Sequence, residues 1–127
     1  NEVIERRREV AQMYQDRLEG LTELQLPPPP SNNSDHFDVY QNYEITADKR
    51  DDLKDYLSKK NIGTLIQWGG KGIHHFTNLG FSQVLPKTDE FFKSCIMLPM
   101  NMFVSDNDVN YVCENIINFY KNDKKGI

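Results

Sequence analysis

The spacing of apolar residues predicts that the chain begins and ends with amphipathic helices. In residues 2–19 apolar side chains recur every three or four positions, and a second such series follows Ser105. This period places the apolar residues of each segment on one helical face, which a folded protein buries. Ser105 and Asp108 have the spacing of a capping box at the start of the last helix. Two more helices are expected, over residues 49–62 and 88–94.

Three other segments have the composition of β-strands. Residues 36–46 alternate between two faces and are rich in aromatic and β-branched side chains, while residues 64–68 and 96–98 are short apolar runs. Helical and strand-like segments therefore alternate along the chain. Three short strands with helices on one side predict a two-layer α/β domain.

This domain is expected to span residues 1–127 with one proline-rich internal loop. Four consecutive prolines in residues 25–35 exclude a helix there. The loop is either a spacer or a ligand for a proline-recognising domain. The chain begins with Asn rather than Met, which favours a fragment of a longer protein over a free-standing one.

Charge and cysteine content narrow the class of protein. The net charge of −4 argues against nucleic acid as a partner, and the arginines at positions 6–8, between Glu5 and Glu9, indicate a solvated helix face. No apolar run reaches the length of a membrane span, and the opening residues have the pattern of a charged helix rather than of a signal peptide. Cys95 and Cys113 lie in apolar segments, so both are expected to be reduced core residues of a cytoplasmic protein.

Candidate binding chemistry gathers in the segment TLIQWGGKGIHHF, residues 64–76. The candidates are Gln67, Trp68, Lys71, His74 and His75. Together they offer a stacking surface, an amide, a positive charge and two titratable rings, which suit a polar, planar or phosphorylated ligand. Two alternatives remain open. In the first, Trp68 is a core residue. In the second, the glycine-rich turn is a plain loop that contacts no phosphate, because it lacks the P-loop spacing.

Neither a metal site nor a catalytic residue is expected. His74 and His75 are adjacent and should point in different directions on regular structure, and His36 is the only other imidazole. No nucleophile lies in a recognisable elbow. Any chemistry near this segment must therefore be supplied from elsewhere.

Several segments, taken in order, resemble the C-terminal small domain of the DegT/DnrJ/EryC1/StrS family of pyridoxal-phosphate-dependent sugar aminotransferases. RRREVAQMYQDRL is similar to the helix that links the family's two domains, and VYQNYEI and RDDLKDYLSKKNIGT are similar to the strand and helix that follow. IHHF lies where the family has Pro-Leu-His, so His74 matches the family's small-domain histidine. LPM and VSDNDVNYVCENI resemble the final strand and helix.

The stretch QWGGKGIHHF departs from the commoner version of the family, which contains His-Tyr-Pro. It looks more like the branch that aminates 3-keto sugars on thymidine diphosphate. The resemblance implies a fold-type-I enzyme whose large domain, absent here, holds pyridoxal phosphate on a lysine. It follows that Lys71 is not that lysine and that this chain alone binds no cofactor.

The resemblance also implies a function and partners. The intact enzyme would aminate a keto-sugar nucleotide for a surface polysaccharide or an antibiotic, and the five candidates would form one wall of the substrate site. The partners of this chain would be the sugar nucleotide, the enzyme's large domain and a second copy in a homodimer. The first helix would pack partly against the large domain. Two alternatives are a free-standing α/β binding module without catalytic activity and an α/β interaction domain without a ligand.

Overall fold

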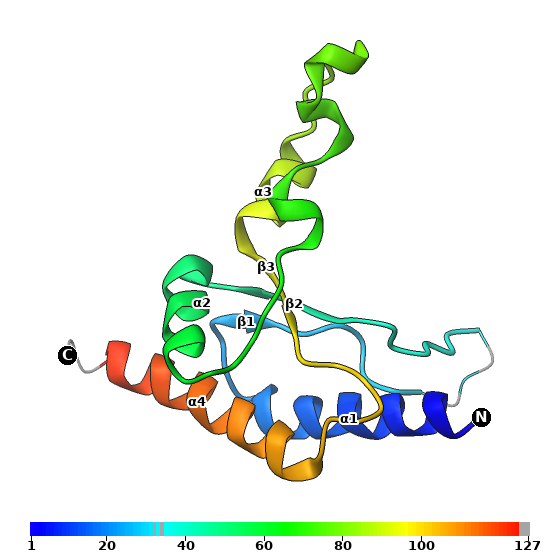
Figure 1. The fold of residues 1–127 in the computed structure, drawn as a ribbon, viewed down its shortest axis with the longest axis vertical. Coiled ribbons are helices and arrows are strands. Elements are labelled where there is room, and N and C mark those ends of the chain that lie inside the picture. Colours follow the sequence, from blue (N-terminus) through cyan, green and yellow to red (C-terminus); the bar gives the residue numbers. More distant parts are fainter. Residues whose placement is uncertain (32, 34, 125–127) are drawn as a thin grey trace.

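The computed structural model describes residues 1–31, 33 and 35–124, apart from the side chain of residue 124. Helices α1 (Glu2–Leu18) and α4 (Asp106–Lys124) pack against each other along one side of a small sheet, and α2 (Arg50–Lys59) packs on α4 (Figure 1). The predicted small α/β architecture with a three-stranded sheet is confirmed. No helix of the described residues is long and apolar enough to cross a membrane.

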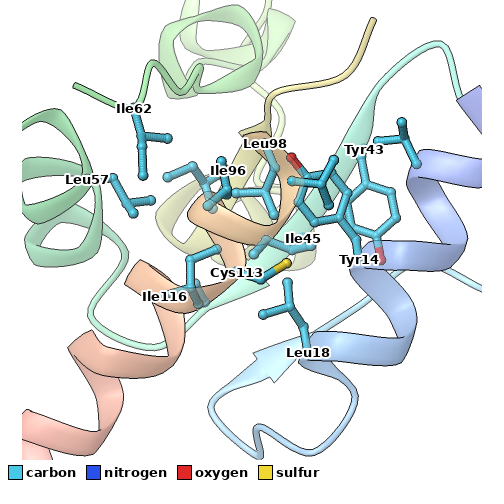
Figure 2. Packing of buried hydrophobic residues seen from close by; sticks show 14 of the residues in the cluster. Tyr14, Leu18, Tyr43, Ile45, Leu57, Ile62, Ile96, Leu98, Cys113 and Ile116 are labelled. Atoms are coloured by element: carbon cyan, nitrogen blue, oxygen red, sulfur yellow. The ribbon is translucent and has the colours of Figure 1, made fainter. Parts of the chain in front are cut away.

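The sheet is antiparallel, with strands in the order β1 (Leu24–Gln25), β2 (Tyr43–Ala47) and β3 (Cys95–Leu98). β2 is the central strand of this sheet. Its inward side chains are buried under the helices, whereas its outward side chains are half-buried. Figure 2 shows this core, in which Tyr43 and Ile45 of β2 meet residues of three helices and of β3.

Two of the predicted strands are wrong: one is shorter than predicted, and the other does not form. The segment 36–46 becomes a strand only at Tyr43, because the Asp38 carboxylate accepts a hydrogen bond from the Tyr40 backbone N–H (2.8 Å) and Tyr40 adopts a φ of 48°. Residues 64–68 do not form a strand. They contribute a single bridge between Leu65 and Met97 before the chain turns. The third strand is instead β1, which the apolar pattern did not predict.

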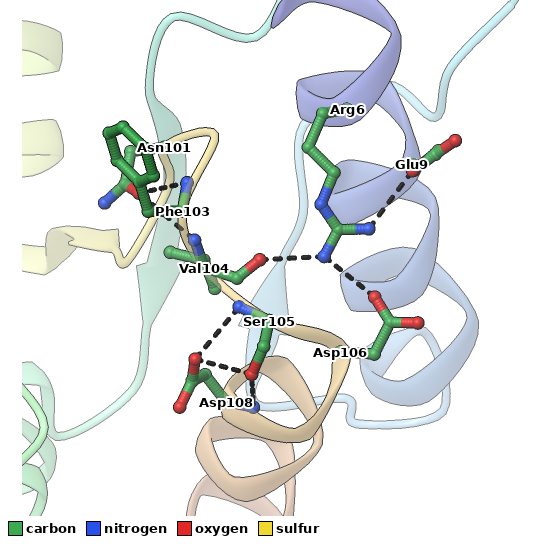
Figure 3. Close-up of polar contacts among 8 residues, drawn as sticks. All are labelled: Arg6, Glu9, Asn101, Phe103, Val104, Ser105, Asp106 and Asp108. Atoms are coloured by element: carbon green, nitrogen blue, oxygen red, sulfur yellow. Dashed lines mark hydrogen bonds and ion pairs between the residues drawn. The ribbon is translucent and has the colours of Figure 1, made fainter. Parts of the chain in front are cut away.

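The arginines at positions 6–8 are not a solvated face, as the charge pattern had suggested. Arg6 donates hydrogen bonds to the Val104 carbonyl (2.7 Å) and to the Asp106 carboxylate (2.8 Å), which ties α1 to the start of α4 (Figure 3). Arg8 donates to the backbone carbonyls of Ser31 and Asp38. These charge-assisted bonds fasten α1 to loops on both of its sides.

The apolar face of α1 is filled within this chain. Its inward residues are completely buried against the sheet and α4, and they are Val10, Ala11, Tyr14 and Leu18. These four positions are therefore unavailable to another domain, whereas Val3 at the start of the helix is 43% exposed. That α1 packs partly against a large domain stays a prediction. Cys95 and Cys113 are buried free thiols, as predicted, and burial raises the pKa of Cys113 to about 12.

Residues 64–94 leave the body as a long projection, which we call the arm (Figure 1). It consists of three short 3₁₀ turns and helix α3 (Pro86–Ser94), which begins two residues before the predicted helix. The base of the arm contacts β3 through residues 67–70 and contacts β2 through α3. All five candidate residues lie in this arm.

Candidate functional site

Trp68 is not a core residue. It lies in a 3₁₀ turn, Gln67–Gly70, and its backbone has a φ of 51°, which is rare for a bulky side chain. The two glycines that follow also have positive φ and continue the turn. As a result the indole is 79% exposed at the base of the arm. The alternative in which Trp68 belongs to the core is therefore excluded.

His74 and His75 point to the same atom, which contradicts the expectation that adjacent histidines diverge. Both lie in the 3₁₀ turn Ile73–His75, and their Nε2 atoms are 2.7 Å and 2.8 Å from Oδ1 of Asp89 on α3. The hydrogen bond from His74 is the largest cause that lowers the pKa of Asp89, and the bond from His75 adds to it. The trio clamps the histidine turn to α3.

The hydrogen bonds around the clamp assign the histidine protons. The Gly72 N–H donates to Nδ1 of His75 (3.0 Å), so the proton of this ring is on Nε2 and faces Asp89. His74 is buried, and its Nδ1 has no partner among the described residues. A side chain at position 72 would collide with this ring, since an added Cβ would lie 2.6 Å from it.

The ligand atoms of His74, His75 and Asp89 lie within 4.8 Å of one another, which is close enough to share a metal ion. However, imidazoles that bind a metal donate their second N–H to an acceptor. Here Nδ1 of His75 faces a donor and Nδ1 of His74 faces no acceptor in the described part of the chain. The arrangement therefore favours a hydrogen-bonded clamp over a metal centre.

The glycine-rich turn offers an anion few free backbone donors. The N–H groups of Gly69, Lys71 and Gly72 donate to Ile66 O, Trp68 O and His75 Nδ1, respectively. A phosphate at this turn would therefore bind mainly to the Lys71 side chain, which is exposed.

Two hollows share a lining residue, Phe92 of α3. The first, about 420 Å³, is the aromatic hollow, and it is lined by Trp68, Lys71, Gly72, Ile73, Phe76, Thr88 and Phe92. The second, about 460 Å³, is the basic hollow, and it is lined by Arg50, Ile66, Gly69, Gly70, His75, Asp89, Phe92 and Lys93.

The predicted residues divide between these features. Trp68 and Lys71 line the aromatic hollow and His75 lines the basic one, whereas His74 is the buried member of the clamp and Gln67 lines neither hollow. Sequence reasoning missed Asp89 and Phe92, whose roles arise only when α3 folds back along the histidine turn.

Comparison with known proteins supports the resemblance seen in the sequence. Residues 1–117 match the DegT/DnrJ/EryC1/StrS aminotransferase family. The "Pleiotropic regulatory protein" of Geobacillus stearothermophilus is 30% identical over 122 residues, which are 92% of this chain and 32% of that protein.

Solved structures show the same fold. The aminotransferase TlmJ from Streptoalloteichus hindustanus aligns with a TM-score of 0.77 at 27% identity, over 91% of this chain and 31% of that one. The PMP form of the putative sugar aminotransferase Spr1654 from Streptococcus pneumoniae aligns with a TM-score of 0.77 at 21% identity, over 89% and 29%. The chain thus spans about a third of the relatives that it matches, and it corresponds to their C-terminal portion.

Proposed function

Because this chain belongs to the DegT/DnrJ/EryC1/StrS aminotransferase family, we propose that it is the C-terminal domain of a pyridoxal-phosphate-dependent enzyme that aminates a keto-sugar nucleotide. The names of the matched structures, a sugar aminotransferase among them, support this substrate class. The stretch QWGGKGIHHF supports the finer assignment to 3-keto sugars carried on thymidine diphosphate.

The observation that carries the proposal is the arm. It holds an exposed tryptophan and an exposed lysine beside a hollow, and it projects away from a body whose own core is filled. Surfaces of this kind bind ligands or complete a site on another domain. The arm would therefore form one wall of the substrate site, with Trp68 and Lys71 contacting the sugar nucleotide and the clamp holding the turn that carries them.

The described residues do not fit a pyridoxal phosphate site. No lysine among the described side chains is buried, whereas a Schiff-base lysine needs an enclosed setting and an acid or arginine partner for the pyridine nitrogen. In the proposed enzyme the cofactor supplies the electron sink for amino transfer, and the other two thirds of the protein hold it. The residues of this chain bind and orient the sugar nucleotide and exclude water.

A second function is favoured by the name of the Geobacillus relative, which describes a regulatory protein. In that case the chain would belong to a protein that binds a sugar nucleotide and performs no amino transfer. Both functions use the same wall, so only a test of turnover separates them.

The test uses the full-length protein from its natural gene, supplied with pyridoxal phosphate, glutamate and a thymidine-diphosphate-linked 3-keto-6-deoxyhexose. We expect mass spectrometry to detect the amino sugar. Trp68→Ala should lower kcat/KM by about ten- to a hundred-fold, the value of a lost aromatic contact, and leave cofactor absorbance unchanged. Phe103→Ala is the control, because Phe103 is equally exposed but lies on the body.

Three results would count against the proposal. Absence of amino transfer with 3- and 4-keto sugar nucleotides would exclude the enzyme and leave the binding function. Equal kinetics for Trp68→Ala and Phe103→Ala would exclude the arm as a substrate wall. An aldimine absorbance band when pyridoxal phosphate is added to residues 1–127 alone would show that this chain holds the cofactor.

A further inference from the structure

The two histidines of the clamp are held by different contacts, and one set of contacts depends on the charge of the ring. We propose that His75 is a pH-dependent latch, which holds the end of the glycine-rich turn while its ring is neutral and releases it when the ring takes a second proton. This inference does not depend on the proposed function, because it concerns the order of the arm rather than its ligand.

The neutral ring of His75 joins two parts of the arm. Its Nδ1 accepts a hydrogen bond from the Gly72 N–H (3.0 Å), and its Nε2 lies 2.8 Å from Oδ1 of Asp89. A neutral imidazole has one acceptor nitrogen and one donor nitrogen, so both are used here. The ring therefore connects the end of the glycine-rich turn to α3, and this connection requires an Nδ1 without a proton.

A charged His75 ring is unable to keep both bonds. The second proton would occupy Nδ1, so two N–H donors would face each other across the present 3.0 Å contact with Gly72. The bond to Asp89 uses the other nitrogen, so it is retained and becomes stronger when the ring is charged. The expected change is therefore local: the histidine turn stays on α3, whereas the glycine-rich turn loses its bond to the clamp.

The second proton is expected on His75 rather than on His74. The His74 ring is buried, and its Nδ1 has no partner among the described residues. This nitrogen also packs against Gly72, since a Cβ added there would lie 2.7 Å from it. A proton at this position would be buried without an acceptor, which is costly. The His75 side chain is 37% exposed, so water reaches its ring.

The charged groups around His75 limit the clamp to one additional proton. Asp89 attracts a charged ring, whereas Arg50 of α2 and Lys93 of α3 line the basic hollow with His75 and oppose it. The ring centres of His74 and His75 are 4.0 Å apart, so two charged rings would repel each other beside one carboxylate. The hydrogen bond from His74, with that from His75, holds the pKa of Asp89 below its usual range, so this carboxylate stays charged where imidazoles titrate.

The release affects the side chains that line the aromatic hollow. Gly72 lines this hollow together with Trp68 and Lys71, which precede it on the same stretch of chain. Without the bond from the Gly72 N–H, these residues lose a fixed position relative to α3. The core of the body contains neither histidine, so mild acid should alter the arm and leave the body folded.

Hydrogen exchange of the Gly72 amide tests the latch directly. It is followed by NMR on the isotope-labelled chain of residues 1–127, whose core is filled by its own residues. The measurement runs from about pH 8 to about pH 5, the range in which imidazoles ordinarily change charge, and each rate is divided by that of an unprotected amide at the same pH. We expect the protection of Gly72 to fall by about five- to tenfold as the His75 ring titrates, the effect of one lost hydrogen bond.

Two variants provide the comparison. In His75→Gln the side-chain amide has an oxygen that can accept from Gly72 and an N–H that can donate to Asp89, but it takes no proton in this range. The protection of Gly72 should therefore no longer depend on pH. His36→Gln is the control, because His36 is exposed and lies outside the arm, and it should leave the pH dependence unchanged. Circular dichroism checks that both variants fold.

The proposal is overturned if the His75 ring does not titrate in this range, or if the protection of Gly72 stays constant while the ring titrates. A rise in protection at low pH would overturn it too, because the charge would then strengthen the turn. A pH dependence that persists in His75→Gln, or that disappears in His36→Gln, would assign the effect to another group. None of these measurements involves amino transfer, so their failure leaves the proposed function standing.

Discussion

Tyr14 and Tyr43 form a matched pair in the core that differs in one hydrogen bond. Their rings stack with centroids 4.8 Å apart, and both are at most 1% exposed (Figure 2). The Tyr14 hydroxyl donates to the Pro99 carbonyl at 2.8 Å. The Tyr43 hydroxyl is equally buried and has no partner among the described residues. Burial raises the pKa of both phenols.

Replacing each tyrosine with phenylalanine should therefore lower the unfolding free energy at position 14 but not at position 43. Tyr14→Phe removes a bond and leaves the Pro99 carbonyl without it, which costs about 1–2 kcal/mol. Tyr43→Phe removes only an unpaired polar group from the core, so its effect should lie between zero and a gain of about 1 kcal/mol. The ring stack survives in both variants, because phenylalanine keeps the aromatic ring.

Urea unfolding of the two variants, followed by far-UV circular dichroism, measures the difference. A separation of about 2 kcal/mol corresponds to about 1 M between the two midpoints at a slope of about 2 kcal/mol/M. The slopes must agree, so that the comparison concerns stability rather than the denatured state. Equal losses in the two variants would refute the argument, because they would show that the hydroxyl contacts do not decide the cost.

Three further results are expected. Ser105→Ala should lower the unfolding free energy by about 1 kcal/mol in urea, because Ser105 caps α4; an equal loss in Ser105→Thr would contradict this. The unfolding free energy should fall from pH 9 to about 12, because the Cys113 thiol deprotonates near pH 9 in the unfolded chain, whereas burial keeps it protonated in the folded one. An unfolding free energy that does not change over this pH range would contradict this prediction. Asp89→Asn should speed proteolysis within the arm relative to the neighbouring control Glu90→Gln, and equal rates would argue against the clamp.

The features that the sequence predicted correctly depend on neighbouring residues. The capping box is an example, because Ser105 and Asp108 are three residues apart. The Asp108 carboxylate accepts hydrogen bonds from the Ser105 N–H and hydroxyl, and the Ser105 hydroxyl oxygen accepts one from the Asp108 N–H, as expected (Figure 3). The helical faces of α1 and α4 likewise follow from a period that can be read in a single segment. The two-layer fold class follows from the order of such segments.

The errors concern contacts between residues far apart in the chain. Strand β1 has two residues, too few to show a period, and exists because Leu24 pairs with Ala47. The arginines at positions 6–8 have acidic neighbours in sequence, which suggested a solvated face, but Arg6 binds a carbonyl 98 residues away. A local pattern contains no information on such partners.

The clamp shows the same limit at the candidate site, and it separates two roles. Asp89 lies 14 and 15 residues beyond the histidines that bind it, so its part in the arm became visible only in three dimensions. His74 and Asp89 are committed to each other and position the turn, whereas Trp68 remains exposed. Substitutions in the clamp should therefore alter the order of the whole arm, whereas substitutions at Trp68 remove a contact surface and leave the core of the body unchanged.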